Sequence, residues 1–232
     1  MALIKYGGGV VGMSGSIAGS TFARNRYGNY VRARTKPVNP NTPAQQNIRS
    51  SIAFLTNYWK NILTSTQRAA WNLYASNVAM KNRMGETTYL TGFNHFIRSN
   101  SVLKYLGLAG VCDGPANFTL PEQDSTFAIT ASEATQVITV AFDATAAWAK
   151  EDGAYLLLAQ GRPQNSTINF YVGPWLLDDS IAGDSGTPPT SPYAYTANKV
   201  ITEGQNVWMQ ARIIRADGRL SEPFRGSCTI AA

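Results

Sequence analysis

Histidine, cysteine and long apolar runs are scarce in this chain of 232 residues. The single histidine, His95, excludes a zinc site built on several histidines. The two cysteines, Cys112 and Cys228, are far apart and lack metal-ligand spacing, so we expect reduced thiols in preference to a disulfide. The longest apolar runs, such as 154–159, are too short to span a bilayer. We therefore expect no membrane partner, and the mixed N-terminal residues predict no signal peptide.

Acidic residues are absent from the first 85 positions, and Glu86 is the first acidic residue of the chain. Residues 1–85 hold eleven Lys and Arg and carry a net charge of +11, whereas residues 86–232 carry −5. A basic segment seeks an acidic partner, which is either nucleic acid or an acidic protein surface. The opposite signs of the two parts also favour head-to-tail contact between copies.

Residues 1–41 form a basic arm rich in Gly, Ser, Arg and Asn, which cannot build a core of its own. Gly28-Asn29 predicts a hairpin turn between strands 22–27 and 30–35, with Arg26 opposite Val31 and Arg24 opposite Ala33. Ordering each residue costs about 1–2 kcal/mol, and a lone hairpin is marginal in water. We expect the arm to become ordered on partner chains, through Phe22, Arg24, Arg26, Tyr27, Tyr30, Arg32 and Arg34. The alternative is a flexible N-terminus without a binding function.

Residues 42–112 predict a small helical region. Capping-box patterns at 42–45 and 64–67 predict the starts of two helices, expected to pack as an antiparallel hairpin. An apolar stripe at helical spacing predicts the inward face of the first helix: Ile48, Ile52, Leu55, Trp59 and Ile62. Thr91 predicts the cap of a third helix that ends at Gly107, after a loop over 82–89.

Residues 113–232 change to a period of two, which is typical of strands. The expected strands are 127–130, 136–142, 154–160, 169–172, 206–215 and 224–230. Short strands separated by turn residues predict an immunoglobulin-like sandwich. The fold class is therefore α+β, with an extended arm, a small helical region and a C-terminal all-β sandwich.

Two resemblances narrow this interpretation. Residues 207–223, with an aromatic strand, Asp217-Gly218 and then Ser-Glu-Pro, resemble the end of fibronectin type III domains, although the segment 173–199 is unusually long for one. Residues 15–25, 37–46, 63–71 and 90–94 resemble a family of uncharacterised proteins encoded by bacteriophages and prophages. This second resemblance implies a structural protein of the virion, such as a capsid decoration, minor capsid or tail-associated protein. Its partners would be other virion proteins and copies of itself. The expected lack of a signal peptide is compatible with release by assembly and lysis instead of secretion.

Two other binding functions stay open on the sequence. The arginines of the arm interleave with Tyr27 and Tyr30, the mixture that holds phosphates and stacks bases in nucleic-acid-binding proteins. The other alternative is an adhesive or carbohydrate-binding module, in which a sugar platform would be lined by Trp148, Trp175, Tyr193 and Tyr195. Aromatic residues in a sandwich are, however, usually core.

Signals for an enzyme are weak. Residues 7–12 match the Gly-x-Gly-x-x-Gly sequence pattern of dinucleotide-binding sites. They lack the preceding strand, the following helix and the acidic residue further along the chain that such a site requires. Residues 183–186 match part of a serine-protease motif, but His95 is the one candidate base and sits in a helical context. A calcium loop at Asp178, Asp179 and Asp184 is less favoured than a solvated acidic turn. We expect no catalytic residue, cofactor, metal or small-molecule substrate.

Overall fold

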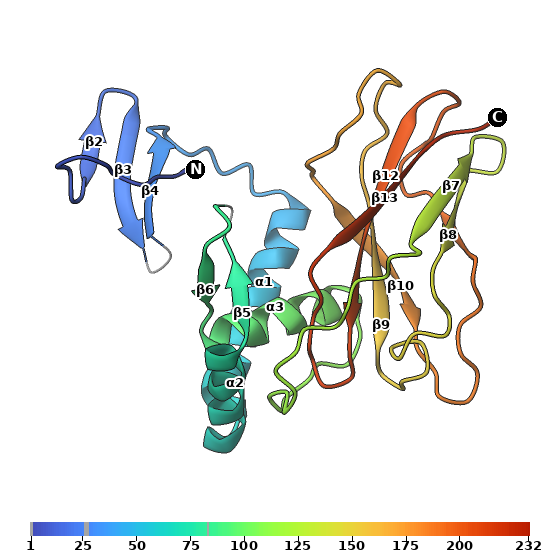
Figure 1. The fold of residues 1–232 in the computed structure, drawn as a ribbon, viewed down its shortest axis with the longest axis horizontal. Helices are drawn as coiled ribbons and strands as arrows, with labels where there is room; N and C mark the ends of the chain where they lie inside the picture. The colour runs from blue at the N-terminus through green and yellow to red at the C-terminus, as the bar shows by residue number, and fades with distance from the viewer. Residues whose placement is uncertain (1, 26–27, 83) are drawn as a thin grey trace.

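The computed structural model describes residues 2–25, 28–82 and 84–232. Figure 1 shows a small N-terminal sheet, a helical region in the middle and a β-sandwich at the other end. Helices and several antiparallel sheets occur together, which confirms the α+β class. In the described part of the chain, no helix is both long and apolar enough to cross a membrane.

The N-terminal arm forms a four-stranded antiparallel sheet rather than a lone hairpin. Its strands are β1 (Ala2–Leu3), β2 (Gly15–Ile17), β3 (Ser20–Asn25) and β4 (Gly28–Ala33), in the order β1-β4-β3-β2.

The predicted hairpin register is wrong, because Arg24 lies opposite Asn29 and not Ala33. The expected partner of Arg26, Val31, lies opposite Phe22. This register pairs two apolar side chains across the strands, which stabilises the hairpin. Gly28-Asn29 therefore opens β4 instead of forming the turn, and the connection at 26–27 lies outside the described residues.

The predicted helix starts are confirmed by their side-chain caps. Thr42 accepts a hydrogen bond from the backbone N–H of Gln45 and begins α1 (Pro43–Asn57), and Thr64 caps α2 (Ser65–Asn77) in the same way. Both have the reciprocal glutamine contact of a capping box. Thr91 caps α3 (Gly92–Tyr105). A π-helical segment, η1 (Tyr58–Ile62), extends α1.

The helices pack around α3 and not as the expected α1–α2 hairpin. The ring of Phe96 in α3 lies 5.4 Å from Trp59 and 5.8 Å from Trp71, between centroids. Phe96, Trp71 and Tyr74 are almost fully buried. The Phe96 side chain therefore brings α1 and α2 to α3, because burying a large aromatic ring removes much apolar area from water.

The loop that was expected at 82–89 is the connection of a short β-hairpin, and its last three residues belong to a strand. The hairpin consists of β5 (Ala79–Lys81) and β6 (Thr87–Tyr89). The Asn82 side chain accepts hydrogen bonds from the backbone N–H groups of Met84 and Glu86, and Gly85 has a φ of +77°. An asparagine and a glycine thus supply the turn chemistry that closes this hairpin.

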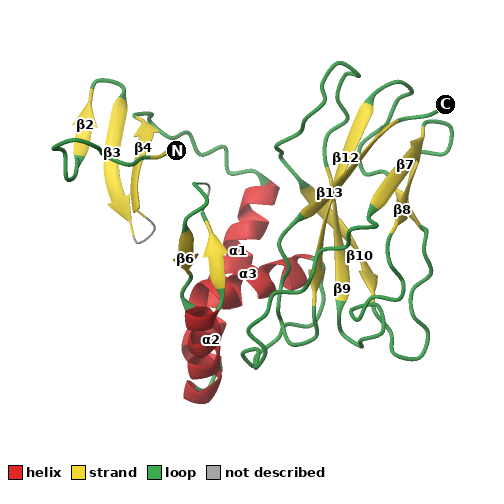
Figure 2. Cartoon of the chain, in the orientation of Figure 1, coloured by secondary structure: helices red, strands yellow, loops and turns green. Residues whose placement is uncertain are grey.

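The C-terminal sandwich has seven strands in two sheets (Figure 2). One sheet has the order β10-β9-β12-β13 and the other β11-β8-β7. The strands are β7 (Ala128–Ser132), β8 (Val137–Ala141), β9 (Tyr155–Gln160), β10 (Leu176–Ala182), β11 (Tyr193–Thr196), β12 (Asn206–Ile214) and β13 (Phe224–Thr229). Side chains such as Ile138, Leu156 and Met209 are fully buried between the sheets.

One of the predicted strands is wrong and two were missed. Residues 169–172 form a loop, where Phe170 and Val172 are 68% and 76% exposed and so have no core to enter. Strands β10 and β11 both come from the segment 173–199, whose Pro, Gly and Asp residues obscured the pattern.

The sandwich is docked on the helices through the hairpin between β12 and β13. Leu103 of α3 is buried with Leu157, Ile214 and Leu220 of the sandwich. Ser99 Oγ donates to the carbonyl of Gly218 at 2.6 Å. Gly218 has a φ of +87°, and a Cβ there would lie 3.2 Å from the Trp71 ring. The turn therefore needs glycine both for its backbone and for its close approach to the helices.

Candidate protein-interaction surfaces

The arm sheet is connected to the helices by an extended segment, residues 34–42, that is exposed throughout. In Figure 1 this sheet and the sandwich lie on opposite sides of the helical region. Lys5 forms an ion pair of 2.5 Å with Glu86 next to the β5–β6 hairpin. The side chains of Lys5 and Glu86 are 65% and 42% exposed, and ion pairs that solvent screens contribute little to stability. Among the described residues, this ion pair is the one salt bridge that joins the arm to the rest of the chain.

The structure places the predicted partner-binding residues on both faces of the arm sheet. Phe22 and Arg24 share one face with Val31, as the strand register requires. Tyr30 and Arg32 share the opposite face. Phe22 and Tyr30 are half-buried, whereas Arg24, Arg32 and Arg34 are exposed. Arg26 and Tyr27 lie outside the described residues.

The arginines of the arm keep their charge available for other molecules. Within the described residues, ion pairs involve Lys5, Arg98, Arg215 and Arg219, and none involves Arg24, Arg32 or Arg34. Arg34 lies just past β4, where its backbone N–H donates to the carbonyl of Gly19. The arm thus presents positive charge on both of its faces and on the segment that follows.

Sequence reasoning found the apolar stripe of α1 but assigned it to the wrong environment. Leu55 is buried as expected, whereas Ile48, Ile52 and Ile62 are 48%, 43% and 59% exposed. The reason is that α3 covers one side of α1 only, through the aromatic cluster described above. Ile48 and Ile52 instead border an open groove with Ile97, Tyr105 and Trp175.

The residues of the weak enzyme motifs do not come together. His95 is 1% exposed and packs edge-on against Tyr74, with ring centroids 5.0 Å apart. Ser185 Oγ donates to Asp152 at 2.9 Å, so its hydrogen-bond partner is a carboxylate and not the histidine. Gly7–Gly12 precede a strand, β2, and not the helix that a dinucleotide site requires.

The proposed aromatic platform for carbohydrate is also not assembled. Trp148 and Tyr195 are 2% and 3% exposed and belong to the core of the sandwich. Tyr193 donates its hydroxyl to Asp179 at 3.0 Å. A flat, exposed set of four rings is therefore absent from these positions.

Free thiols and carboxylates do not form a metal centre in the described part of the chain. Cys112 and Cys228 are both free. No group of three or more His, Cys, Asp or Glu side chains among the described residues is arranged to hold a metal ion. Asp184, one of the three aspartates considered for calcium, instead accepts hydrogen bonds from the backbone N–H groups of Gly186 and Thr187.

Similarity to known proteins is found in the structure of this chain and not in its sequence. No protein-family model matches the chain, and no curated protein matches it. A solved structure of a Fn3-like protein from Clostridium thermocellum is similar over 49% of this chain and 97% of its own, with a TM-score of 0.33 and 9% identity. The seven strands of the sandwich form a four-stranded and a three-stranded sheet, as predicted for a sandwich over residues 113–232.

Proposed function

We propose that this protein is a structural subunit of a bacteriophage virion, in which the arm sheet and helices bind neighbouring subunits. One observation carries the proposal: a basic sheet stands at the end of an exposed, extended segment, and Arg24, Arg32 and Arg34 form no ion pair with the described residues. Such a geometry suits contact with another molecule better than it suits the stability of the monomer.

The edges of the arm sheet offer a route for that contact. Strands β1 and β2 are the two edges, and all three residues of β2 are exposed. An edge strand presents unpaired N–H and C=O groups, to which a neighbouring chain can add a strand. The exposed face of α1 at Ile48 and Ile52 gives a second, apolar contact area.

We propose a virion as the assembly because the sequences of the arm and helices resemble those of phage and prophage proteins. A capsid decoration, minor capsid or tail-associated role accords with a small domain that is carried on an anchoring region. The partners would be other virion proteins and further copies of this chain.

Binding of nucleic acid is the second candidate, because exposed Arg24 and Arg32 accompany the half-buried Tyr30 on one small sheet. A salt titration separates the two. An affinity for DNA or RNA that falls steeply and linearly with the logarithm of salt concentration would favour this candidate.

Deletion of residues 1–40 tests the main proposal. The truncated protein should be soluble and folded, because the helices and the sandwich share buried cores that do not include the arm. It should fail to enter particles, as measured by electron microscopy and by the protein content of purified virions. Normal incorporation would contradict the proposal.

A charge variant makes the test more specific. Replacing Arg24, Arg32 and Arg34 with glutamine should reduce incorporation. A control that replaces the exposed sandwich residues Lys150, Arg162 and Lys199 with glutamine removes the same charge and should incorporate normally.

A further inference from the structure

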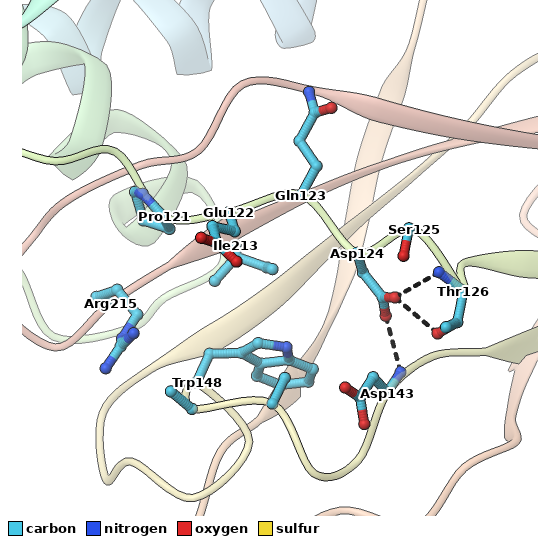
Figure 3. Close-up of a pocket in the computed structure, with 12 residues that line it drawn as sticks. Pro121, Glu122, Gln123, Asp124, Ser125, Thr126, Asp143, Trp148, Ile213 and Arg215 are labelled. Carbon is cyan, nitrogen blue, oxygen red and sulfur yellow. Dashed lines mark hydrogen bonds between the residues drawn. The ribbon is translucent and has the colours of Figure 1, made fainter.

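A cleft of about 370 Å³ lies at one end of the sandwich and belongs to none of the surfaces above (Figure 3). Three segments that are distant in the sequence form it: residues 121–126 before β7, residues 143–148 after β8, and residues 213–215 at the end of β12. Glu122, Asp124 and Asp143 bring three carboxylates to this cleft.

The cleft carries net negative charge. Its arginine, Arg215, already forms an ion pair with Glu151. Hydrogen bonds from the Thr145 hydroxyl and backbone N–H hold the pKa of Asp143 below its usual value, so this carboxylate is ionised at neutral pH. Asp124 is fixed in place, because it accepts hydrogen bonds from the backbone N–H of Asp143 and from Thr126.

A buried donor in the same cleft has no partner. Trp148 is 2% exposed, and its indole Nε1 makes no hydrogen bond in the described part of the chain. Figure 3 shows this nitrogen on the side of the ring that faces the other cleft residues. An unsatisfied buried donor costs about 1–3 kcal/mol, which a ligand carrying an acceptor atom would recover.

These features together specify the chemistry of the ligand. Three carboxylates require cationic groups, and the indole N–H requires an acceptor such as a peptide carbonyl. A metal ion does not fit, because no group of three metal-binding side chains exists among the described residues. A basic peptide in extended conformation supplies both kinds of group.

Resting on the proposed function, we infer that this acidic cleft binds the segment 32–36 of the arm of a second copy. Arg34 and Lys36 are exposed, and in an extended chain their side chains point to the same side. Both would pair with the carboxylates of the cleft, and a main-chain carbonyl would accept from Trp148 Nε1. Pro37 favours the extended backbone that this arrangement needs.

The segment comes from another copy because the arm and the sandwich lie at opposite ends of the molecule (Figure 1). The net charges of +11 for residues 1–85 and −5 for residues 86–232 are complementary in such a head-to-tail contact. A contact of this type joins two different surfaces, so it propagates into a ring or an open lattice.

Nuclear magnetic resonance tests the inference directly at the cleft. A ¹⁵N-labelled full chain carrying R34Q and K36Q, so that it cannot fill its own cleft, is titrated with a synthetic peptide of residues 30–38. The chain has five tryptophans, so five indole N–H resonances are followed. We expect a saturable shift of the Trp148 resonance and at least a fivefold weaker affinity after Glu122→Gln.

Two controls isolate the electrostatic contact. The peptide with both R34Q and K36Q should leave the Trp148 resonance unmoved. Glu203→Gln removes an exposed carboxylate elsewhere on the sandwich and should leave the affinity unchanged. Equal shifts by both peptides, or no shift by either, would overturn the inference.

The result can be separated from that of the arm deletion. If the deletion abolishes incorporation while the peptide leaves Trp148 unmoved, the cleft is not the receptor, although the arm is still the anchor. If the peptide binds as expected while the deleted protein incorporates normally, the cleft inference holds for isolated chains and the proposed function fails.

Discussion

His95 is an ionisable side chain buried in the helical region. It is 1% exposed, and its Nε2 has no hydrogen-bond partner among the described residues. Burial first, and then the neighbouring positive charge of Arg98, lowers the pKa of His95 to about 4. The neutral imidazole is therefore the form that the fold accepts, and His95 is a packing residue of α3 beside Tyr74.

This shift predicts a loss of stability in mild acid. The pKa in the folded state is lower than the value of about 6.5 in the unfolded chain, so the unfolded state binds the proton first as pH falls. Stability contributed by neutral His95 is complete above pH 6.5 and is lost progressively toward pH 4. Between pH 6.5 and 5 the loss should be about 2 kcal/mol. Urea denaturation at both pH values, compared with His95→Phe, measures it; an equal loss in the variant would show that other groups are responsible.

At the scale of elements, sequence patterns correctly predicted the features that neighbouring residues determine, such as the starts of the helices. Thr42, Thr64 and Thr91 cap their helices because each cap is decided within four residues. The register of β3 against β4 and the exposure of Ile48 depend on which distant side chains pack together, so local patterns misplaced them. Strands β10 and β11 were missed because the Pro, Gly and Asp residues of segment 173–199 obscured the alternating pattern.

Of the two candidate sites, one could be predicted from the sequence and the other could not. The exposed arginines of the arm could be predicted, because composition and the absence of acidic residues mark them within one segment. The acidic cleft could not, because Asp124, Asp143 and Trp148 meet only after three separated segments have folded together. The spacing of these residues along the chain therefore does not predict the cleft.

The contact between α3 and the β12–β13 hairpin depends on Arg98. Its guanidinium donates to the carbonyl groups of Leu220 and Ser221, at 2.8 and 3.2 Å, and pairs with Glu222. Arg98→Met should destabilise the protein by about 2–4 kcal/mol, because it leaves carbonyl groups without partners. Chemical denaturation measures this. Arg225→Met, which removes an exposed arginine over the Trp175 ring, should cost less than about 1 kcal/mol; equal costs would refute the role assigned to Arg98.

At the scale of the whole molecule, stability is distributed unequally. The helices and the sandwich are joined by the buried cluster of Leu103, Leu157, Ile214 and Leu220, so they should unfold together. The residues that make up the three buried cores all lie between Leu55 and Ile230, outside the arm sheet. The strands of the arm thus have ladder hydrogen bonds but little buried apolar area to maintain them.

Hydrogen exchange should reveal this division and its dependence on assembly. In a dilute monomer the amides of β3 and β4 should exchange within seconds, because opening the sheet exposes little apolar surface and so costs little free energy. The amides of α3, β9 and β12 should be protected by factors close to those of global unfolding. In assembled particles the amides of β3 and β4 should become protected, because a neighbouring chain then covers them. Strong protection of the arm in the monomer would mean that the sheet is stable alone, and the energetic reason for seeking a partner would disappear.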